Sequence, residues 1–229
     1  MAVDEALLES ASITRQPTLR FYSWAEPTLS LGYFQRFEDR SLHQASCECP
    51  VVRRTSGGGA IIHDRELTYS FCVPVGDRVS DDLIALYRNF HETLVRTLNS
   101  FNVIASMYAL GGSTGRQHSF LCFQRRADGD VIINERKIAG SAQRRHKGAV
   151  LQHGSVLLSS SRNAPELPGI KEISGVALDV NTLAANWTKE IAQTLQIRLE
   201  KSSLTASEER LACQRQNRKF TNDLWTKRR

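Results

Sequence analysis

Three consecutive glycines lie between short apolar segments in the stretch Arg53-Arg54-Thr55-Ser56-Gly57-Gly58-Gly59-Ala60-Ile61-Ile62-His63. Without a Cβ, such a run lets backbone amides approach a ligand that a side chain would push away. The Gly-x-x-x-x-Gly-Lys spacing of a phosphate-binding loop is absent, and no helix with a lysine follows. Two interpretations stay open, a tight hairpin and a ligand-contacting loop. The second is favoured by the preceding arginines, by His63, and by a second run of small residues, Gly140-Ser141-Ala142, next to Lys137.

On both sides of this stretch, apolar residues recur at the spacing of two typical of strands in some segments and at the spacing of three to four typical of helices in others. Alternating apolar residues predict strands at 19–24, 29–33 and 67–73. Apolar residues three and four apart predict a helix that begins at a Ser80 cap and continues to residue 98. A short helix is also expected at residues 2–10.

The second half of the chain returns to strands and then ends in helices. Strands are predicted at Cys122, 131–133, 137–144 and 150–158, with turns at Asp128-Gly129 and Lys147-Gly148. A helix at 181–195, a short strand at 197–199 and a last helix with a Thr205 and Glu208 capping box follow. This succession predicts an α+β fold of mixed, mainly antiparallel sheets flanked by helices.

Composition limits the class of protein. The chain has 229 residues, 41% of them hydrophobic and 24% charged, which fits one domain over residues 1–229, with 181–229 as its C-terminal helical extension. No apolar run approaches the roughly 18 residues of a membrane-spanning helix, and the first residues lack the basic start of a secretory signal. We therefore expect a cytoplasmic protein without a membrane partner.

Cysteine use and charge narrow the expected ligands. The five cysteines are odd in number and scattered, which predicts free thiols. No metal is expected at Cys47-Glu48-Cys49, because zinc sites need two paired ligand sets. The net charge is +6, and 23 of the 30 basic residues are Arg, which suits acidic protein partners. We expect no nucleic acid, since the arginines are spread along the chain and no nucleic-acid-binding signature occurs.

One cysteine and one lysine carry the candidate chemistry. Cys122 lies in Phe120-Leu121-Cys122-Phe123, and Lys137 follows fifteen residues later. A thiolate attacks acyl compounds far better than a thiol, and a nearby ammonium favours the thiolate. The alternative interpretation is that Cys122 is a small hydrophobic residue of the core, as a cysteine between Leu and Phe often is.

A second candidate nucleophile can be set aside. Gly111-Gly112-Ser113-Thr114-Gly115 matches the Gly-x-Ser-x-Gly pattern of serine hydrolases. That pattern requires a strand before it and a helix after it, whereas Arg116-Gln117-His118 leads into a predicted strand. We interpret the segment as a loop.

Three ordered blocks remain to be interpreted together: residues 53–63 with Glu66 to Ser70, Lys137 to Gln143, and Leu151 to Leu158. They resemble the signature blocks of the lipoate-protein ligase A and octanoyltransferase family. The resemblance extends from the first helix to residues 222–228, so it covers nearly the whole chain. It implies a catalytic module shared with biotin-protein ligases, which holds a medium-chain acyl group beside the glycine block. Cys122-Phe123 resembles the cysteine-before-lysine octanoyltransferase branch most.

The resemblance implies a transfer mechanism. Cys122 would accept an octanoyl group from acyl carrier protein and pass it to a lysine of a lipoyl-accepting domain, the glycine cleavage H protein or a 2-oxoacid dehydrogenase E2. Lys137 would favour the thiolate and position the acyl carbonyl, and backbone amides around Gly140 to Ala142 or Gly57 to Gly59 would stabilise the oxyanion. The acyl or substrate-binding residues implied in this way are Arg54, Ser56, Gly57, Gly58, Gly59, His63, Gly140, Ser141, Ala142, His153 and Gly154.

Other functions stay open. No cofactor is required for transfer, whereas an ATP-dependent lipoate-protein ligase would need ATP and Mg. Gly59 makes its block look like the ligase version, since many cysteine-type transferases have Arg there. Ligases of this family often carry an accessory C-terminal domain of about a hundred residues, and this chain ends soon after Trp225. An amidotransferase between lipoyl domains and a non-catalytic acyl-carrier-binding protein are further alternatives.

Overall fold

The computed structural model describes residues 1–75, 79–109 and 119–229, and their architecture is α+β, as predicted. Six antiparallel strands form the larger sheet, in the order β1-β5-β9-β8-β7-β6. The strands are β1 (Thr18–Tyr22), β5 (Glu66–Pro74), β6 (Ser106–Met107), β7 (Val131–Ile133), β8 (Arg136–His146) and β9 (Ala149–Leu157).

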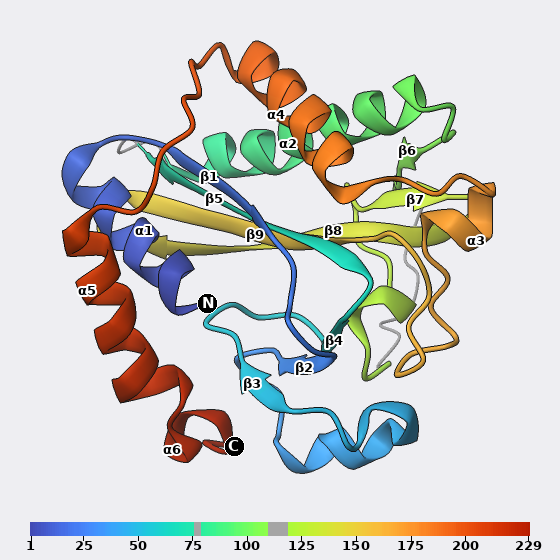
Figure 1. Cartoon of the computed structure of the whole chain (residues 1–229), viewed down its shortest axis with the longest axis horizontal. Helices are drawn as coiled ribbons and strands as arrows, with labels where there is room; N and C mark the ends of the chain where they lie inside the picture. The colour runs from blue at the N-terminus through green and yellow to red at the C-terminus, as the bar shows by residue number, and fades with distance from the viewer. Residues whose placement is uncertain (76–78, 110–118) are drawn as a thin grey trace.

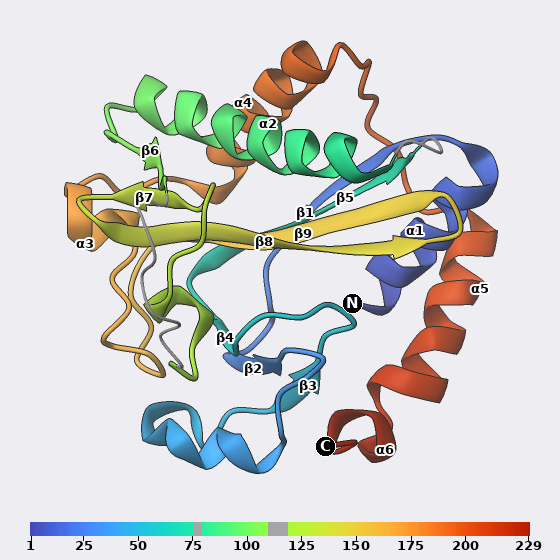
Figure 2. The ribbon, with the colours of Figure 1, turned by 180° about the vertical axis from the view of Figure 1, so that it is seen from behind.

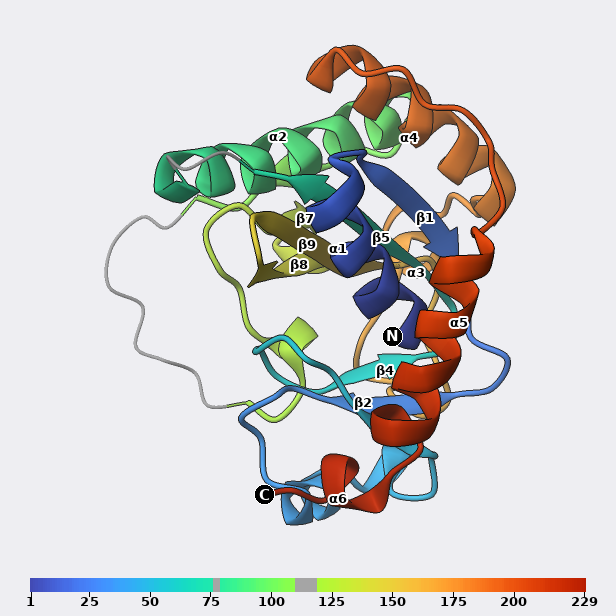
Figure 3. The same cartoon turned by 90° about the vertical axis from the view of Figure 1, so that its left-hand side faces the viewer.

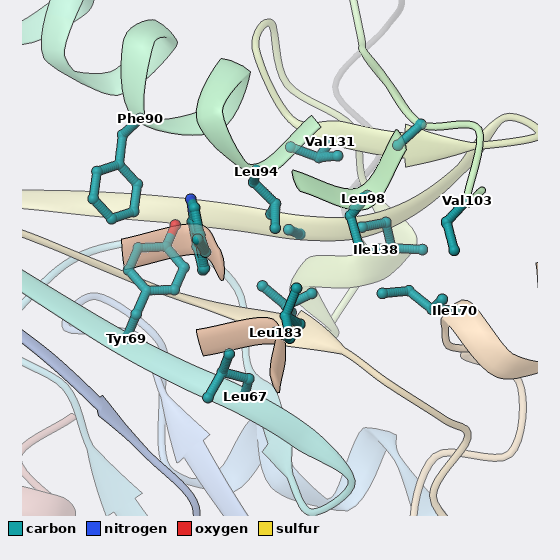
Figure 4. Close-up of a cluster of buried hydrophobic side chains, with 14 of the residues drawn as sticks. Leu67, Tyr69, Phe90, Leu94, Leu98, Val103, Val131, Ile138, Ile170 and Leu183 are labelled. Carbon is teal, nitrogen blue, oxygen red and sulfur yellow. The ribbon is translucent and has the colours of Figure 1, made fainter. Parts of the chain in front are cut away.

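Two long helices cover one face of this sheet, α2 (Val79–Ser100) and α4 (Val180–Leu195), as Figures 1 and 2 show. Side chains three and four residues apart on α2 point toward the sheet and meet the odd-numbered side chains of β5. Trp187 of α4 is fully buried in the same layer. Figure 4 shows the resulting core, which includes Leu67, Tyr69, Phe90, Leu94, Leu98 and Leu183.

A smaller sheet lies on the opposite side of the large one from α2 and α4 (Figure 1). It consists of β2 (Thr28–Leu31), β3 (Val51–Arg53) and β4 (Ile61–His63), with β2 parallel to β3 and antiparallel to β4. Leu29, Leu31 and Ile62 are buried in its own hydrophobic cluster. The glycine run therefore connects two strands of the small sheet and faces the large one.

Helix α1 (Ala2–Thr14) packs Leu7, Leu8 and Ala11 on the ends of β5 and β9, on the side of the large sheet away from α2. Helix α5 (Ala206–Arg215) lies along α1 (Figure 3) and begins at the predicted capping box of Thr205 and Glu208. Within the described ranges, none of the helices combines the length and apolar character needed to cross a bilayer. The other helical elements are α3 (Ile170–Ser174), α6 (Asp223–Thr226), the 3₁₀ turns η1 (Glu38–Leu42), η2 (Gln44–Ser46) and η3 (Cys122–Gln124), and the π-helical η4 (Gln216–Phe220).

Two predicted strands are wrong. Cys122 begins the 3₁₀ turn η3, because the chain there pairs only through one isolated bridge, Ala60 with Leu121. Residues 197–199 have no strand partner, and their apolar side chains pack on the core from an irregular segment. The Gly111–Gly115 pattern lies outside the described residues, and at Ser80 the structure describes the backbone alone, so neither prediction is tested.

Candidate active site

Two buried arginines precede the glycine loop; Arg54 holds the loop itself, and Arg53 holds the segments packed around it. The Arg53 guanidinium donates to the carbonyl oxygens of Gly32 (2.9 Å), Gln35 (2.6 Å) and Thr226 (2.9 Å). Arg54 donates to the carbonyls of Ser30 and Gly59, both at 2.7 Å. Each guanidinium bonds several carbonyl oxygens at once, which arginine can do because its planar group carries five N–H donors.

Arg54 also brings a buried positive charge to the site. Within the described chain it has no carboxylate partner, and its acceptors are neutral oxygens. Burial lowers the pKa of Arg54 to about 10, and the charge of Cys122 opposes this shift. Arg54 and Cys122 line the same pocket, so the buried positive charge of Arg54 contributes to the electrostatics around the thiol.

The Cys122 turn is attached directly to the glycine loop. The backbone N–H of Cys122 donates to the carbonyl of Ala60 at 2.8 Å, and that of Ala60 donates to the carbonyl of Phe120 at 3.0 Å. Leu121 and Phe123 are buried, whereas Cys122 is partly exposed and lines a pocket. The core-residue interpretation of Cys122 is therefore wrong.

Lys137 reaches the same point from β8. A β-bulge in the pairing of β7 with β8, where Val131 pairs with Ala139 and Ile132 with Lys137, changes the register at this residue. Bulges of this kind re-aim a side chain. The Lys137 Nζ lies 3.8 Å from the Cys122 Sγ and 2.8 Å from the Asp130 Oδ2. Burial alone would lower the pKa of Lys137, but the charges of Cys122 and Asp130 outweigh it and raise that pKa.

One pocket between the two sheets brings most of the predicted site residues together. In the described part of the chain, its walls also include seven residues that were not predicted: Met1, Tyr22, Trp24, Ile61, Thr68, Phe123 and Ser155. Ser56 and Gly59 are not among the lining residues; Ser56 lies behind His153, and Gly59 packs on the Cys122 turn. The predicted residues that line the pocket are Arg54, Gly57, Gly58, His63, Cys122, Lys137, Gly140, Ser141, Ala142, His153 and Gly154.

The two histidines are engaged by other side chains. In His63, Nδ1 lies 2.7 Å from Glu66 Oε1 and Nε2 lies 2.7 Å from Ser30 Oγ, and the ring stacks on Trp24. His153 Nε2 lies 2.5 Å from Ser56 Oγ, and burial lowers its pKa to about 4. Both ring nitrogens of His63 are engaged by Glu66 and Ser30, so neither is available to a substrate as a general base. His153 stays neutral near pH 7 because of its lowered pKa.

At two of the lining positions, Gly140 and Gly154, a Cβ atom would collide with neighbouring atoms, so only glycine fits. A Cβ on Gly154 would lie 2.2 Å from the Gly140 carbonyl oxygen and 2.6 Å from the Tyr69 hydroxyl. A Cβ on Gly140 would lie 2.6 Å from the Lys137 Cε and 2.8 Å from the Asp130 Oδ1. The small residues of the second block thus make room for the buried lysine, as much as for a ligand.

Asp130 is a charged residue at the site that was also not predicted from the sequence. It follows Asp128-Gly129 directly, and that pair was interpreted as a turn signal only. Its contact with Lys137 depends on the bulge between β7 and β8, which leaves no local signature. Among the described residues, no group of three His, Cys, Asp or Glu side chains could hold a metal ion.

Comparison with known proteins gives a consistent set of matches. The model of the lipoyl protein ligase A/B catalytic domain matches residues 1–192. Octanoyltransferase LipM of Clostridioides difficile is 33% identical over 256 residues, which is 100% of this chain and 94% of that protein. Octanoyltransferase LipM of Kyrpidia tusciae is also 33% identical, with the same coverage.

Solved structures agree on the fold. Lipoate-protein ligase A bound with ATP matches with a TM-score of 0.81 at 23% identity, covering 99% of this chain and 92% of that one. A chain from the structural analysis of an archaeal lipoylation system, a bipartite lipoate protein ligase and its E2 lipoyl domain from Thermoplasma acidophilum, matches with a TM-score of 0.77 at 23% identity, covering 99% of this chain and 89% of that one. At this identity the likeness concerns the fold, which agrees with the predicted ligase-type catalytic domain.

Proposed function

Because the chain belongs to the lipoyl protein ligase A/B catalytic domain family, we propose that it is an octanoyltransferase of protein lipoylation that acts through a Cys122 thioester. The observation that carries this proposal is the 3.8 Å approach of the Lys137 Nζ to the Cys122 Sγ at a pocket beside the glycine loop. The relatives that match over the whole chain are octanoyltransferases.

The reaction has two steps. The Cys122 thiolate attacks the thioester carbonyl of octanoyl-acyl carrier protein, and the bond to the carrier sulfur breaks, so that the carrier leaves as a thiolate that takes up a proton. The amine of a lipoyl-domain lysine then attacks the Cys122 thioester, the carbon–sulfur bond breaks, and the amine proton passes to the sulfur. Thioester exchange is nearly isoenergetic and amide formation is downhill, so the transfer needs no ATP or other cofactor.

Three features of the site support these steps. Lys137 and Arg54 supply positive charge around the Cys122 thiolate. The ammonium of Lys137 can donate to the oxyanion of the tetrahedral intermediate, a type of contact that often contributes most to catalysis. The pocket between the sheets offers the acyl chain apolar walls, with Trp24, Ile61 and Phe123 among them.

The partners follow from this chemistry. The donor is acyl carrier protein, and the acceptors are lipoyl domains such as the H protein or an E2. The net charge of +6 favours their encounter if these partners are acidic, because opposite charges raise association rates. We place the protein in the cytoplasm, where free thiols persist.

An ATP-dependent lipoate-protein ligase is the second candidate, and one observation favours it. Gly59 has no room for a side chain, because a Cβ there would lie 2.7 Å from an Arg125 nitrogen and 3.0 Å from the Cys122 backbone nitrogen. The triple-glycine form of the loop is thus built into the packing of this site. A ligase would form an adenylate from free lipoate and ATP without any carrier protein.

One experiment separates the candidates. The purified protein is incubated with an acceptor domain and either octanoyl-acyl carrier protein or free lipoate, each with and without ATP, and Cys122 is examined by mass spectrometry. We expect transfer without ATP and an octanoyl adduct on Cys122. Cys122→Ser should abolish both, whereas the control Cys213→Ser, at an exposed cysteine on α5, should retain both. Undiminished transfer by Cys122→Ser, or a strict need for ATP, would favour the ligase.

A further inference from the structure

A buried carboxylate holds the lysine of the site. The Asp130 Oδ2 lies 2.8 Å from the Lys137 Nζ, and only 2% and 6% of the two side chains are exposed. The carboxylate is therefore closer to the ammonium than the Cys122 sulfur is, at 3.8 Å. An ion pair this deeply buried is a poor source of stability, since desolvation cancels much of the attraction. Its presence next to a nucleophile asks for a functional explanation.

Asp130 is itself fixed from several sides. The backbone N–H of Ala127 donates to Oδ2 at 2.7 Å, and the Tyr87 hydroxyl of α2 donates to Oδ1 at 3.1 Å. Gly140 lies under the pair, where a Cβ would come within 2.8 Å of both Oδ1 and the Lys137 Nζ. The turn before β7, helix α2 and strand β8 thus build one cradle that fits a carboxylate and an ammonium together.

The donors of the ammonium can be counted. A protonated lysine has three N–H groups. One points to Asp130 and one to Cys122, and the third has no acceptor in the part of the chain that the structure describes. The Phe123 ring, 5.6 Å away, covers the ammonium without accepting a strong hydrogen bond. The remaining N–H is therefore available to an oxygen of a ligand in the pocket.

We propose that Asp130 is a positioning residue of the transfer reaction: it keeps Lys137 protonated and holds its ammonium so that one N–H meets the Cys122 sulfur and another meets the acyl carbonyl oxygen. This inference rests on the proposed function. It makes Lys137 a permanent donor in both steps and not the base that deprotonates the acceptor amine. No bond to Asp130 forms or breaks.

The charge balance around Lys137 gives the expected pH behaviour. Titratable groups face it from η3, from the turn before β7 and from α2: Cys122, Asp130, Tyr87 and His91. The pKa of His91 is lowered by burial to about 4, and burial raises the pKa of Tyr87, so both stay neutral near pH 7. Removing the charge of Asp130 leaves only Cys122 to oppose burial, so the pKa of Lys137 falls.

The test measures the first half-reaction alone, the octanoylation of Cys122 by octanoyl-acyl carrier protein, as a function of pH. For Asp130→Asn we expect kcat to fall at least about tenfold with little change in KM, and the alkaline limb of the pH profile to move to lower pH. Asp130→Glu, which keeps the charge, should restore the position of that limb. The control Asp128→Asn changes a surface carboxylate of the same turn, paired with Arg88, and should leave the profile unchanged.

The results of this test distinguish a failure of the inference about Asp130 from a failure of the proposed function. If Asp130→Asn lowers the rate by one factor at every pH, Asp130 has only a structural role and the inference is wrong. It is equally wrong if the variant matches the wild type. Should Asp130→Asn fail to fold, Asp130→Ser, which leaves room for a water molecule, takes its place with the same criteria. If the wild-type protein forms no adduct on Cys122, it is the proposed function that fails, which a changed profile cannot mimic.

Discussion

Gly140→Ala is expected to slow octanoylation of Cys122 without unfolding the protein. The backbone at this position of β8 has no positive φ, so alanine suits the strand. The new Cβ, however, would lie 2.6 Å from the Lys137 Cε, and ordinary contact begins at 3.4 Å. The lysine side chain must therefore retreat by about 0.8 Å, which is the difference between these two distances.

The size of the effect follows from the charge separation. With an effective dielectric constant of about 20, unit charges attract with about 4.4 kcal/mol at the 3.8 Å between Nζ and Sγ, and with about 3.6 kcal/mol when 0.8 Å is added. The loss of about 0.8 kcal/mol corresponds to roughly a fourfold slower reaction. Misplacement of a reacting group by about 1 Å can cost up to about 100-fold, so the decrease should lie between these limits.

Stopped octanoylation reactions, analysed by intact-protein mass spectrometry, measure this rate. Arg145→Gln, an exposed position on the same strand outside the pocket, is the matched control and should react like the wild type. A Gly140→Ala protein with the wild-type melting temperature and an unchanged rate would refute the reasoning, because Lys137 would then not need its observed place.

Three further changes test the fold and its pH dependence. Gly154→Ala places a Cβ 2.2 Å from the backbone oxygen of Gly140, which cannot move aside, and should destabilise the protein by about 1–3 kcal/mol in urea unfolding. Thr205→Ala removes the capping box of α5 and should cost about 1 kcal/mol, lowering the melting temperature by about 2–4 °C with octanoyl transfer unchanged. Burial lowers the pKa of His91 and of His153 to about 4, against about 6.5 for an exposed histidine. The unfolded chain therefore binds protons first, and stability should fall as the pH drops from about 6.5 to about 4, by up to about 3 kcal/mol for each histidine. Urea midpoints that stay constant through this pH range would contradict this.

The periodic elements were predictable because their signals are local. The spacing of apolar residues on α2 and α4 corresponds to one buried face of each helix. The predicted Lys147-Gly148 turn corresponds to two residues with φ of 42° and 75°. The turn at Asn134 and Glu135, with φ of 46° and 63°, was missed, because glutamate rarely adopts this region. A sequence pattern cannot reveal a backbone conformation that the rest of the fold imposes.

The site was predictable only where it coincides with its motifs. Cys122 and Lys137 lie in recognisable blocks, and the structure brings their side chains together. Asp130 lies seven residues before Lys137 and contacts it only because a bulge in β8 redirects the lysine. Trp24, which stacks on His63, follows the end of strand β1 and lies far from Cys122 and Lys137 in the sequence. Such contacts depend on tertiary packing, and no spacing rule encodes them.

The chemical state of the sulfur at position 122 during turnover is the most direct test of this account. The protein is mixed with octanoyl-acyl carrier protein in the absence of ATP and acceptor, digested, and the peptide that contains Cys122 and Lys137 is sequenced by mass spectrometry. We expect one octanoyl group on Cys122, released when an acceptor lipoyl domain is added. An unmodified cysteine, in a protein that still lipoylates the acceptor when ATP and free lipoate are supplied, would contradict it.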